Sequence, residues 1–351
     1  MFATKSRNKP YVIAEFGVNY YDTARVLGIT PLEAAKKYID EAAEAGIDCA
    51  KFQTYKADTI ASIHSPSYWD TTKETSTSQY ELFKKYDSFG QEEYGILSDY
   101  AHEKGLDFTS TPFDYESADY LEKMVDFYKI SSSDITNLPF IRYIAAKGKA
   151  VCLSVGASYL SEIDEAVRAI MDEGCKDITL FHCMLSYPTS PENANLEQIR
   201  TLKRLYPELT IGYSDHVAPD EGMITLTTAY LYGAEVIEKH FTLDKILPGN
   251  DHYHAGDPED FRRARKNFDW IQLVRGTGEK TVFPCEEESR KQARRSLVAA
   301  RNIRQGEVLS RYDFVAKRPG TGIPPTMLDM VDGRTARVDI KRDTILTYEM
   351  I

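Results

Sequence analysis

Apolar and polar positions follow two alternating periods from residue 11 to about residue 242. Short runs rich in β-branched and aromatic residues are separated by longer stretches in which apolar residues recur at helical spacing. We expect the short runs to be strands with the bounds Tyr11–Phe16, Asp48–Gln53, Asp107–Thr111, Phe127–Ser131, Ala150–Ser154, Asp177–His182, Thr210–Tyr213 and Glu235–Phe241. Strands that alternate with helices pair in parallel through right-handed crossovers, and eight such units close into a (β/α)8 barrel.

Several expected helices carry start signals. Thr30 precedes Pro31, and Glu33 completes a capping box with Thr30. A second helix is expected over residues 161–174, and a third begins after Asp257, which also precedes a proline. These start signals support helices between the expected strands.

The longest interruption of the pattern is Thr54–Gln91, which is rich in Ser, Thr, Tyr and charge. A loop of this length after the second strand is uncommon in a compact domain and often forms an active-site lid. A surface insertion is the equally weighted alternative.

The pattern changes after about Gly278. We expect a barrel domain over 1–280, a linker over 281–291 and a second domain over 292–351. The second domain is expected to consist of turns and the short strands Ser296–Ala300, Gly306–Leu309, Phe314–Ala316, Arg337–Val338 and Thr344–Thr347. A domain of this size needs to dock on something larger for full stability.

Composition excludes some functions. The net charge of -11 over 351 residues argues against a nucleic-acid partner, because a phosphate backbone needs a basic face. No apolar stretch has the length of a membrane span, and the first ten residues lack the apolar region of a signal peptide, so we expect a cytoplasmic protein. The five cysteines are scattered without metal-type spacing and are expected to be reduced.

Polar side chains gather at the expected carboxyl ends of the strands, where (β/α)8 barrels carry their active sites. A lysine within an apolar strand is expensive to bury unless an anion meets it. Lys51 and Lys129 therefore indicate a site for a phosphate or a carboxylate. The alternative is that either lysine pairs with Glu15 or Glu238 as part of the barrel structure. The other candidates are Gln53, Thr111, Ser132, Asp134, Ser154 and Ser214.

The stretches Ile211–His216 and Val236–His240 overlap the last two expected strands, and each is an apolar run that leads into a histidine. If these strands are neighbours, both imidazoles emerge at the same rim, close enough to share a metal ion. Two imidazoles suit a borderline transition metal and leave open the coordination positions that Lewis-acid catalysis requires. His252 and His254 offer a competing pair, but this H-x-H is a weak signal. We expect both to contact substrate or to lie at the surface.

Many of these residues lie in stretches that resemble the sialic acid synthase family, the phosphoenolpyruvate-condensing enzymes that make nine-carbon 2-keto acids. The matching stretches are IAEFGVN (13–19), KFQT (51–54), STPF (110–113), YKISS (128–132), GYSDH (212–216), EKHFT (238–242) and PGNDH (248–252). The C-terminal segment is similar to the antifreeze-like (SAF) domain of that family through RSLVA (295–299) and KRPGTGI (317–323). The likeness keeps the family's order over nearly the whole chain.

The resemblance implies roles for particular residues. His216 and His240 would hold a divalent metal, most often Mn²⁺, with Mg²⁺ or Co²⁺ as alternatives. Phosphoenolpyruvate would be bound by Lys51, Thr111, Lys129, Ser132, Ser154 and Ser214. The sugar and the attacking water would be surrounded by Glu15, Gln53, Asp134, Tyr187 and Asp251. Arg318 would reach the active site of the other protomer and contact the N-acyl group of the sugar, which implies a domain-swapped homodimer.

Some positions depart from the family's usual pattern. Residues 20–22 read Tyr-Tyr-Asp where the family generally has His-Asn-Gly. Leu185 stands where a small polar residue contacts phosphate in relatives, which leaves Ser186 or His182 to replace it. Asp134 stands where many bacterial members have Glu, and Asp also occurs in members that accept 6-phosphosugars. These changes leave the reaction class in place and the sugar open.

The implied activity is that of a nonulosonic acid synthase, which joins phosphoenolpyruvate to an N-acylated aminohexose with release of phosphate. Candidate sugars are N-acetylmannosamine, its 6-phosphate and the 2,4-diacetamido-trideoxyhexoses. One alternative is another phosphoenolpyruvate–aldose condensing synthase, but those enzymes generally lack the terminal domain. The other is a non-catalytic sugar-binding homologue, against which the intact Glu15, Lys51, Lys129, His216 and His240 argue.

Overall fold

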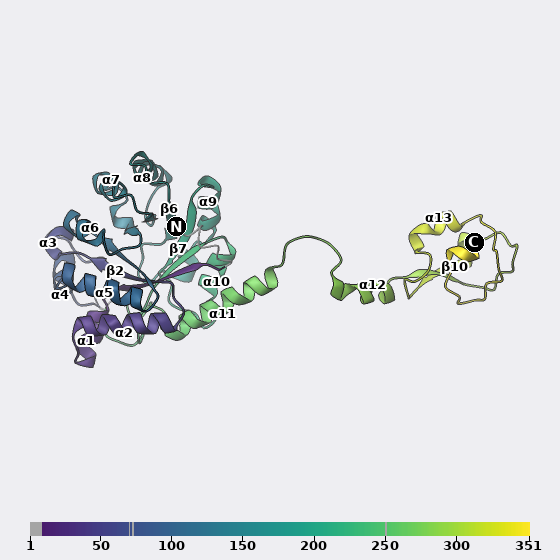
Figure 1. The fold of residues 1–351 in the computed structure, drawn as a ribbon, viewed down its shortest axis with the longest axis horizontal. Coiled ribbons are helices and arrows are strands. Elements are labelled where there is room, and N and C mark those ends of the chain that lie inside the picture. Colours follow the sequence, from purple (N-terminus) through teal and green to yellow (C-terminus); the bar gives the residue numbers. More distant parts are fainter. Residues whose placement is uncertain (1–8, 70, 72–73, 250) are drawn as a thin grey trace. The chain divides into compact units, whose positions relative to one another are not determined.

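The computed structural model describes residues 9–69, 71, 74–249 and 251–351 (Figure 1). The chain divides into two compact units, Met1–Gly276 and Thr277–Ile351. The sequence pattern places this boundary at residue 280.

The first unit is a barrel of eight parallel strands, as the sequence predicts. Their bounds are β1 Tyr11–Gly17, β2 Cys49–Thr54, β3 Asp107–Pro112, β4 Tyr128–Ile130, β5 Val151–Ser154, β6 Ile178–Cys183, β7 Thr210–Asp215 and β8 Val236–His240. The strand order is β3-β2-β1-β8-β7-β6-β5-β4, so β1 pairs with β8. Between β3 and β4, the backbone N–H of Asp126 donates to the carbonyl of Phe108 (2.8 Å), and the hydroxyl of Thr109 donates to the carbonyl of Phe127 (2.6 Å).

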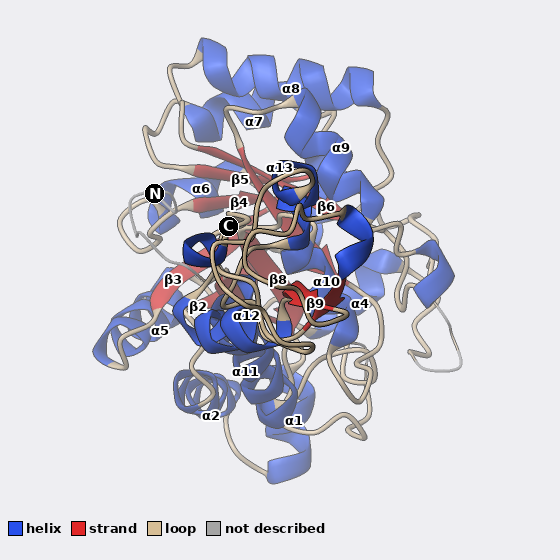
Figure 2. Ribbon diagram, turned by 90° about the vertical axis from the view of Figure 1, so that its right-hand side faces the viewer, coloured by secondary structure: helices blue, strands red, loops and turns tan. Residues whose placement is uncertain are grey.

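Helices surround the strands of this barrel (Figure 2). Their bounds are α1 Tyr20–Leu27, α2 Pro31–Glu44, α3 Ala57–Ile60, α4 Gln79–Lys85, α5 Gln91–Glu103, α6 Tyr115–Leu121, α7 Leu138–Ala145, α8 Leu160–Asp172, α9 Glu197–Leu205, α10 Ile224–Leu231 and α11 Pro258–Arg275. Among the described residues, none of these helices has the length and apolarity needed to cross a membrane.

Two of the expected helix starts are present. Thr30 and Glu33 form the capping box of α2, in which the backbone N–H of Thr30 donates to the Glu33 carboxylate at 2.8 Å. Asp257 caps α11 by accepting from the backbone N–H of Asp260 at 2.9 Å. Helix α8 begins at Leu160, slightly earlier than the expected residue 161.

The 54–91 segment contains more structure than the sequence predicts. It includes α3 and α4 and a bridge between Pro66 and Ser78. Leu82, Tyr86 and Phe89 are buried and belong to the main hydrophobic core of the barrel unit. The surface-insertion alternative therefore does not hold for the part of the segment that carries these three side chains.

The interior of the barrel is layered, because alternate residues of each strand point inward. The lower layer is an apolar cluster of Tyr11, Ile13, Cys49, Phe127, Cys152, Phe181 and Val236. Two residues further along each strand, the same inward faces carry Glu15, Lys51, Lys129, Ser154, Cys183 and Glu238. A Cβ at Gly212 would lie 2.8 Å from the Phe181 ring, so this apolar floor requires glycine there. The polar layer thus lies directly on an apolar base.

The second unit has its own core and little regular structure. Helix α12 (Glu287–Ala293) precedes the antiparallel pair β9 (Ser296–Ala299) and β10 (Phe314–Lys317), and the short helix α13 (Leu328–Val331) follows. The expected strands at 306–309 and 344–347 are reduced to the isolated bridges Val308–Thr335 and Val298–Ile345. The core is formed by Leu297, Ala299, Ile303, Leu309, Phe314, Ile323, Val331, Ala336, Ile340, Leu346 and Ile351.

Candidate active site

Most of the predicted site residues line one cavity of about 60 Å³ above the apolar floor, which we call the lysine cavity. Residues from every strand of the barrel contribute to it. They are Glu15, Lys51, Gln53, Thr111, Phe113, Lys129, Ser131, Ser132, Ser154, Cys183, Tyr187, Ser214, His216, Glu238 and His240. The inward alternation of the strands therefore brings together most of the residues singled out from the sequence.

Both buried lysines bind carboxylates. Lys51 forms an ion pair with Glu15, and its Nζ lies 3.6 Å from Oε1 of Glu238. Lys129 Nζ lies 3.6 Å from the same Glu238 oxygen and donates a 2.6 Å hydrogen bond to Ser154 Oγ. The structural pairing considered as an alternative is present. Both lysines nevertheless line the cavity, where their ammonium groups can also meet a bound anion.

The charged side chains in this cavity shift one another's pKa values. Burial acts to raise the pKa of Glu238, but Lys129 and Lys51 outweigh it and hold that pKa below its usual value. Burial acts to lower the pKa of Lys51, but Glu15 and Glu238 outweigh it and keep it raised. Burial raises the pKa of Glu15 more than Lys51 lowers it. Glu15 is therefore the carboxylate of this group that takes up a proton more readily than usual.

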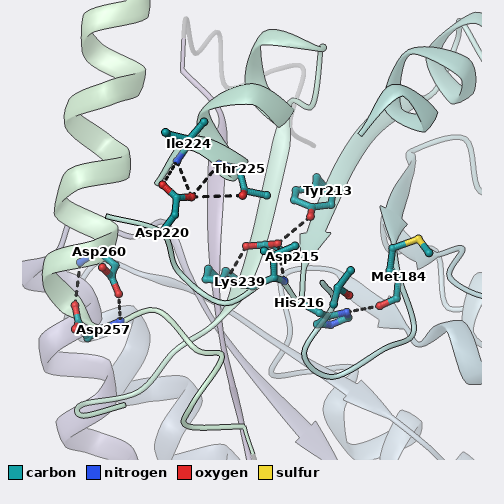
Figure 3. Close-up of polar contacts among 12 residues, drawn as sticks. Met184, Tyr213, Asp215, His216, Asp220, Ile224, Thr225, Lys239, Asp257 and Asp260 are labelled. Atoms are coloured by element: carbon teal, nitrogen blue, oxygen red, sulfur yellow. Dashed lines mark hydrogen bonds and ion pairs between the residues drawn. The ribbon is translucent and has the colours of Figure 1, made fainter. Parts of the chain in front are cut away.

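His216 and His240 lie side by side at the rim, with ring centroids 5.5 Å apart. His216 Nδ1 lies 2.7 Å from the carbonyl oxygen of Met184 (Figure 3), which assigns the proton to Nδ1 and leaves Nε2 with a free lone pair. Burial lowers the pKa of His216 to about 4, and burial together with His254 and His216 lowers that of His240. Both rings are therefore neutral, which is the form that binds metals.

A buried pair behind these histidines fixes the ends of β7 and β8. Lys239 Nζ donates to Asp215 Oδ2 and to the carbonyl of Val217, both at 2.7 Å. The hydroxyl of Tyr213 donates to Asp215 Oδ1 at 2.8 Å (Figure 3). Because Asp215 precedes His216 and Lys239 precedes His240, this contact sets the relative positions of the two imidazoles.

A third imidazole lies beside this pair. The ring centroid of the fully buried His254 is 5.1 Å from that of His240. One oxygen of Asp251 is 3.7 Å from His254 Nε2, and the other is 3.9 Å from His240 Nδ1. Burial, together with the carboxylates of Glu15 and Asp22, raises the pKa of Asp251 to about 7. His240, Asp251 and His254 offer ligand atoms that all lie within 4.8 Å of one another.

His252 and His254 were expected to contact substrate or to lie at the surface, and the surface position is wrong for both. His252 is also fully buried, with Nδ1 2.7 Å from Thr242 Oγ1. The loop after β8 folds back against the strand end, where the N–H of Gly256 donates to the carbonyl of His240 at 2.8 Å. This backbone contact, which has no signature in the sequence, carries both imidazoles inward.

A second cavity of about 110 Å³ shares Gln53, Tyr187 and His240 with the lysine cavity. We call it the aromatic cavity. Its other lining residues are Val18, Asn19, Asp22, Tyr55, Tyr68, Trp69, Leu82, Phe83, Tyr86 and Asp251. Most of the aromatic side chains come from the 54–91 segment, and sequence reasoning missed them. The available signal was the density of aromatic residues in a stretch expected to be a loop.

Two residues named from the sequence, Asp134 and His182, line neither cavity, and a third, Arg318, belongs to the second unit. Asp134 follows β4, is half-buried, accepts a 3.2 Å hydrogen bond from Asn137, and is absent from the described linings of both cavities. Arg318 is exposed in the second unit. His182 points away from the barrel interior, with Nε2 2.8 Å from the carbonyl of Ala194. It therefore cannot supply the phosphate contact that the apolar side chain of Leu185 is unable to make.

A closed parallel barrel with its charged residues at the carboxyl ends of the strands is typical of (β/α)8 enzymes. Residues 38–280 match the NeuB family, and residues 294–351 match the SAF domain. Because the first match spans more than half of the chain, the chain belongs to the NeuB family.

The relatives include synthases of several nine-carbon sugar acids. The chain is 34% identical to an N,N'-diacetyllegionaminic acid synthase of Legionella pneumophila, over 97% of this chain and 94% of that one. It is 28% identical to the N-acetylneuraminate-9-phosphate synthase of Homo sapiens, over 97% and 92%. The crystal structure of an N-acetylneuraminic acid synthetase from Leptospira borgpetersenii is similar with a TM-score of 0.68 and 33% identity, over 80% of this chain and 90% of that one.

Proposed function

We propose that this protein is a nonulosonic acid synthase that joins phosphoenolpyruvate to an N-acylated aminohexose and releases phosphate. Its relatives include an N,N'-diacetyllegionaminic acid synthase, a pseudaminic acid synthase and an N-acetylneuraminate-9-phosphate synthase. The observation that carries the proposal is the contact between two unlike cavities. One holds two buried lysines, the other is walled by aromatic rings, and they share Gln53, Tyr187 and His240.

The lysine cavity suits phosphoenolpyruvate, which carries a phosphate and a carboxylate close together. Lys51 and Lys129 would form charge-assisted hydrogen bonds to these groups, which are stronger than neutral ones. The apolar floor beneath excludes water and strengthens this attraction. Hydroxyl donors for the remaining oxygens would come from Thr111, Ser132, Ser154 and Ser214.

His216 and His240 would hold a divalent metal such as Mn²⁺. The residues fit this role because both imidazoles are buried and neutral, and His240 Nδ1 has no hydrogen-bond partner in the described part of the chain. When bound, the metal supplies Lewis acidity that polarises the acceptor aldehyde.

In the proposed reaction, C3 of phosphoenolpyruvate forms a bond to the aldehyde carbon of the acceptor, whose oxygen takes up a proton. Water then adds at C2, and phosphate leaves with cleavage of its C–O bond. Glu15 would accept the proton that water loses, since its raised pKa makes it a better base than an ordinary carboxylate. Gln53 Nε2 donates to Glu15 Oε1 at 2.9 Å and orients this carboxylate.

Phosphoenolpyruvate labelled with ¹⁸O in its bridging position tests this proposal. Incubation with Mn²⁺ and N-acetylated aminosugars should release phosphate that carries the label, because the C–O bond breaks. Lys51→Ala should abolish the release, whereas replacement of the exposed Lys123 should not. Unlabelled phosphate, or no release with any aminosugar, would contradict the proposal.

A further inference from the structure

We propose that the acceptor sugar is uncharged and carries no 6-phosphate. This inference rests on the proposed function, because it concerns the sugar that the aromatic cavity would hold. The family resemblance leaves both kinds of sugar open, and the charge distribution of the two cavities decides between them.

The two cavities differ in charge. The lysine cavity contains two ammonium groups. Among the described residues that line the aromatic cavity there is no lysine or arginine, but there are two carboxylates, Asp22 and Asp251. Within the part of the chain that the structure describes, an anionic group on the acceptor would therefore find no cationic side chain in this wall.

The cations behind the wall are already paired. Arg25 lies 2.8 Å from Asp22 with its side chain two thirds exposed, and Lys85 lies 2.8 Å from Glu74. The Asp22 oxygens also accept hydrogen bonds from the hydroxyl of Tyr86 at 3.1 Å. Neither Arg25 nor Lys85 is among the described residues that line the aromatic cavity.

The aromatic side chains suit an apolar sugar substituent. Tyr55 packs on Phe83 with ring centroids 5.1 Å apart, and Tyr68 packs on Trp69 at 5.5 Å. These rings offer apolar faces to the methyl group of an N-acyl substituent or of a 6-deoxy carbon. The ligand class is thus an uncharged N-acylated aminohexose.

A phosphate would be penalised by repulsion from the Asp22 carboxylate. Two like charges about 4 Å apart lose between roughly fivefold and a thousandfold in affinity, depending on the local dielectric. We therefore expect kcat/KM for N-acetylmannosamine to exceed that for its 6-phosphate by at least about tenfold. The assay is phosphate release from phosphoenolpyruvate in the presence of Mn²⁺.

Two variants make the test specific. Phe83→Lys adds a cation to the wall and should raise the relative kcat/KM for the 6-phosphate, and Asp22→Asn should do the same by removing a carboxylate. Asp99→Asn makes the same charge change at an exposed site on α5 and should leave the ratio unchanged. A preference of the wild type for the 6-phosphate would overturn this inference alone. Absence of release with both sugars and with a 2,4-diacetamido-trideoxyhexose would overturn the proposed function as well.

A separate observation extends the metal-binding set, and we infer that His254 and Asp251 are ligands together with His240. Neither ring nitrogen of His254 has a hydrogen-bond partner among the residues described, although the side chain is fully buried. Tyr253 and Tyr187 pack around the ring, with centroids 5.0 Å and 5.9 Å away.

Buried polar groups are almost always paired, and an unpaired one calls for an explanation such as a bound ion. The ligand atoms of His240, Asp251 and His254 lie within 4.8 Å of one another. Two imidazoles and one carboxylate form a donor set suited to first-row divalent transition metals. A metal at this position would satisfy His254 and His240 Nδ1 together.

Titration of metal-free protein with Co²⁺ tests this set without any measurement of activity. Loss of an outer-shell partner already weakens metal binding 10- to 100-fold, so His254→Gln should raise the Kd for Co²⁺ by at least about tenfold. His254→Cys should add a thiolate-to-Co²⁺ charge-transfer band that the wild type lacks. His252→Gln, the same change at a neighbouring buried histidine, should keep the wild-type Kd.

Circular dichroism and the Tm in chelator confirm that each variant is folded. If His254→Gln keeps the wild-type Kd and His254→Cys shows no new band, His254 is not a ligand. Either a raised Kd in His254→Gln or a new band in His254→Cys, with His252→Gln unchanged, supports the assignment.

Discussion

At the scale of single residues, Lys129 gives a direct prediction for the binding of phosphoenolpyruvate. Its Nζ donates a hydrogen bond to Ser154 Oγ and lies 3.6 Å from Glu238 Oε1. The same Glu238 oxygen lies 3.6 Å from Lys51 Nζ. Hydrogen bonds to charged groups contribute about 1.5–3 kcal/mol, so Lys129→Ala should raise the Kd for phosphoenolpyruvate by roughly 10- to 150-fold. Isothermal titration measures this change, and the exposed Lys123→Ala serves as control. A Kd within twofold of the wild type would contradict the assignment.

His216 gives a residue-scale prediction for pH. Burial lowers its pKa in the folded protein to about 4, whereas the unfolded value is about 6.5. Its contribution to stability is therefore complete above pH ~6.5 and is lost as the pH falls towards 4, by about 2–3 kcal/mol. Urea unfolding in chelator at pH 7 and pH 4.5 should show a smaller loss for His216→Gln than for the wild type. Replacement of the exposed His64 should leave the wild-type loss unchanged, and equal losses in His216→Gln would refute the prediction.

Strand residues of the site were predictable because the period of two fixes which side chains point inward. Lys51, Lys129 and His240 lie on strands, and the structure places all of them at the lysine cavity. The clustering of Asp251 and His254 was not predictable, since it depends on how a loop folds back. Asp134 lies beyond the end of β4, where the strand period no longer fixes the direction of a side chain, and it lines neither cavity.

At the scale of elements, the alignment of β7 with β8 depends on the buried pair of Asp215 and Lys239. Removal of one partner of such a pair costs about 3–5 kcal/mol, because the other charge remains buried and unpaired. Lys239→Met should therefore lower the free energy of unfolding strongly, and Asp215→Asn combined with Lys239→Met should recover part of the loss. A double-mutant cycle by urea unfolding measures the coupling, and strictly additive losses would contradict it.

The 54–91 segment illustrates what sequence patterns omit at this scale. Helices α3 and α4 have four and seven residues, too few for a hydrophobic period to be recognised. In contrast α2, with fourteen residues and a capping box, was predicted at its start. Long helices with capping signals can be predicted from sequence, whereas short helices depend on tertiary packing such as that of Leu82.

At the scale of the whole molecule, the order of the two domains followed from the change in pattern and from the motifs near residues 295 and 318. The β-structure of the second unit could not be predicted in the same way, because much of it consists of single bridges. These are held by backbone hydrogen bonds, such as that from the N–H of Ile303 to the carbonyl of Ile340 (2.8 Å). We propose, from the family resemblance, that Arg318 of one protomer contributes to the active site of another in a homodimer.

Mixing inactive variants tests this proposal. Lys51→Ala would disable the barrel site, and Arg318→Ala would remove the arginine supplied to it. Mixed dimers, formed by co-expression, should regain up to about a quarter of wild-type turnover per protomer in a random mixture, since one site per heterodimer receives both intact residues. Light scattering should give twice the chain mass. A monomer, or no recovery on co-expression, would contradict the shared site.

The central claim is that two buried lysines above an apolar floor bind phosphoenolpyruvate next to the aromatic cavity. A crystal structure of the protein with phosphoenolpyruvate measures this most directly. The account predicts its phosphate and carboxylate within hydrogen-bond distance of Lys51 Nζ and Lys129 Nζ, with C3 facing the aromatic cavity. Phosphoenolpyruvate bound elsewhere, with both lysines still paired only to Glu15 and Glu238, would contradict it.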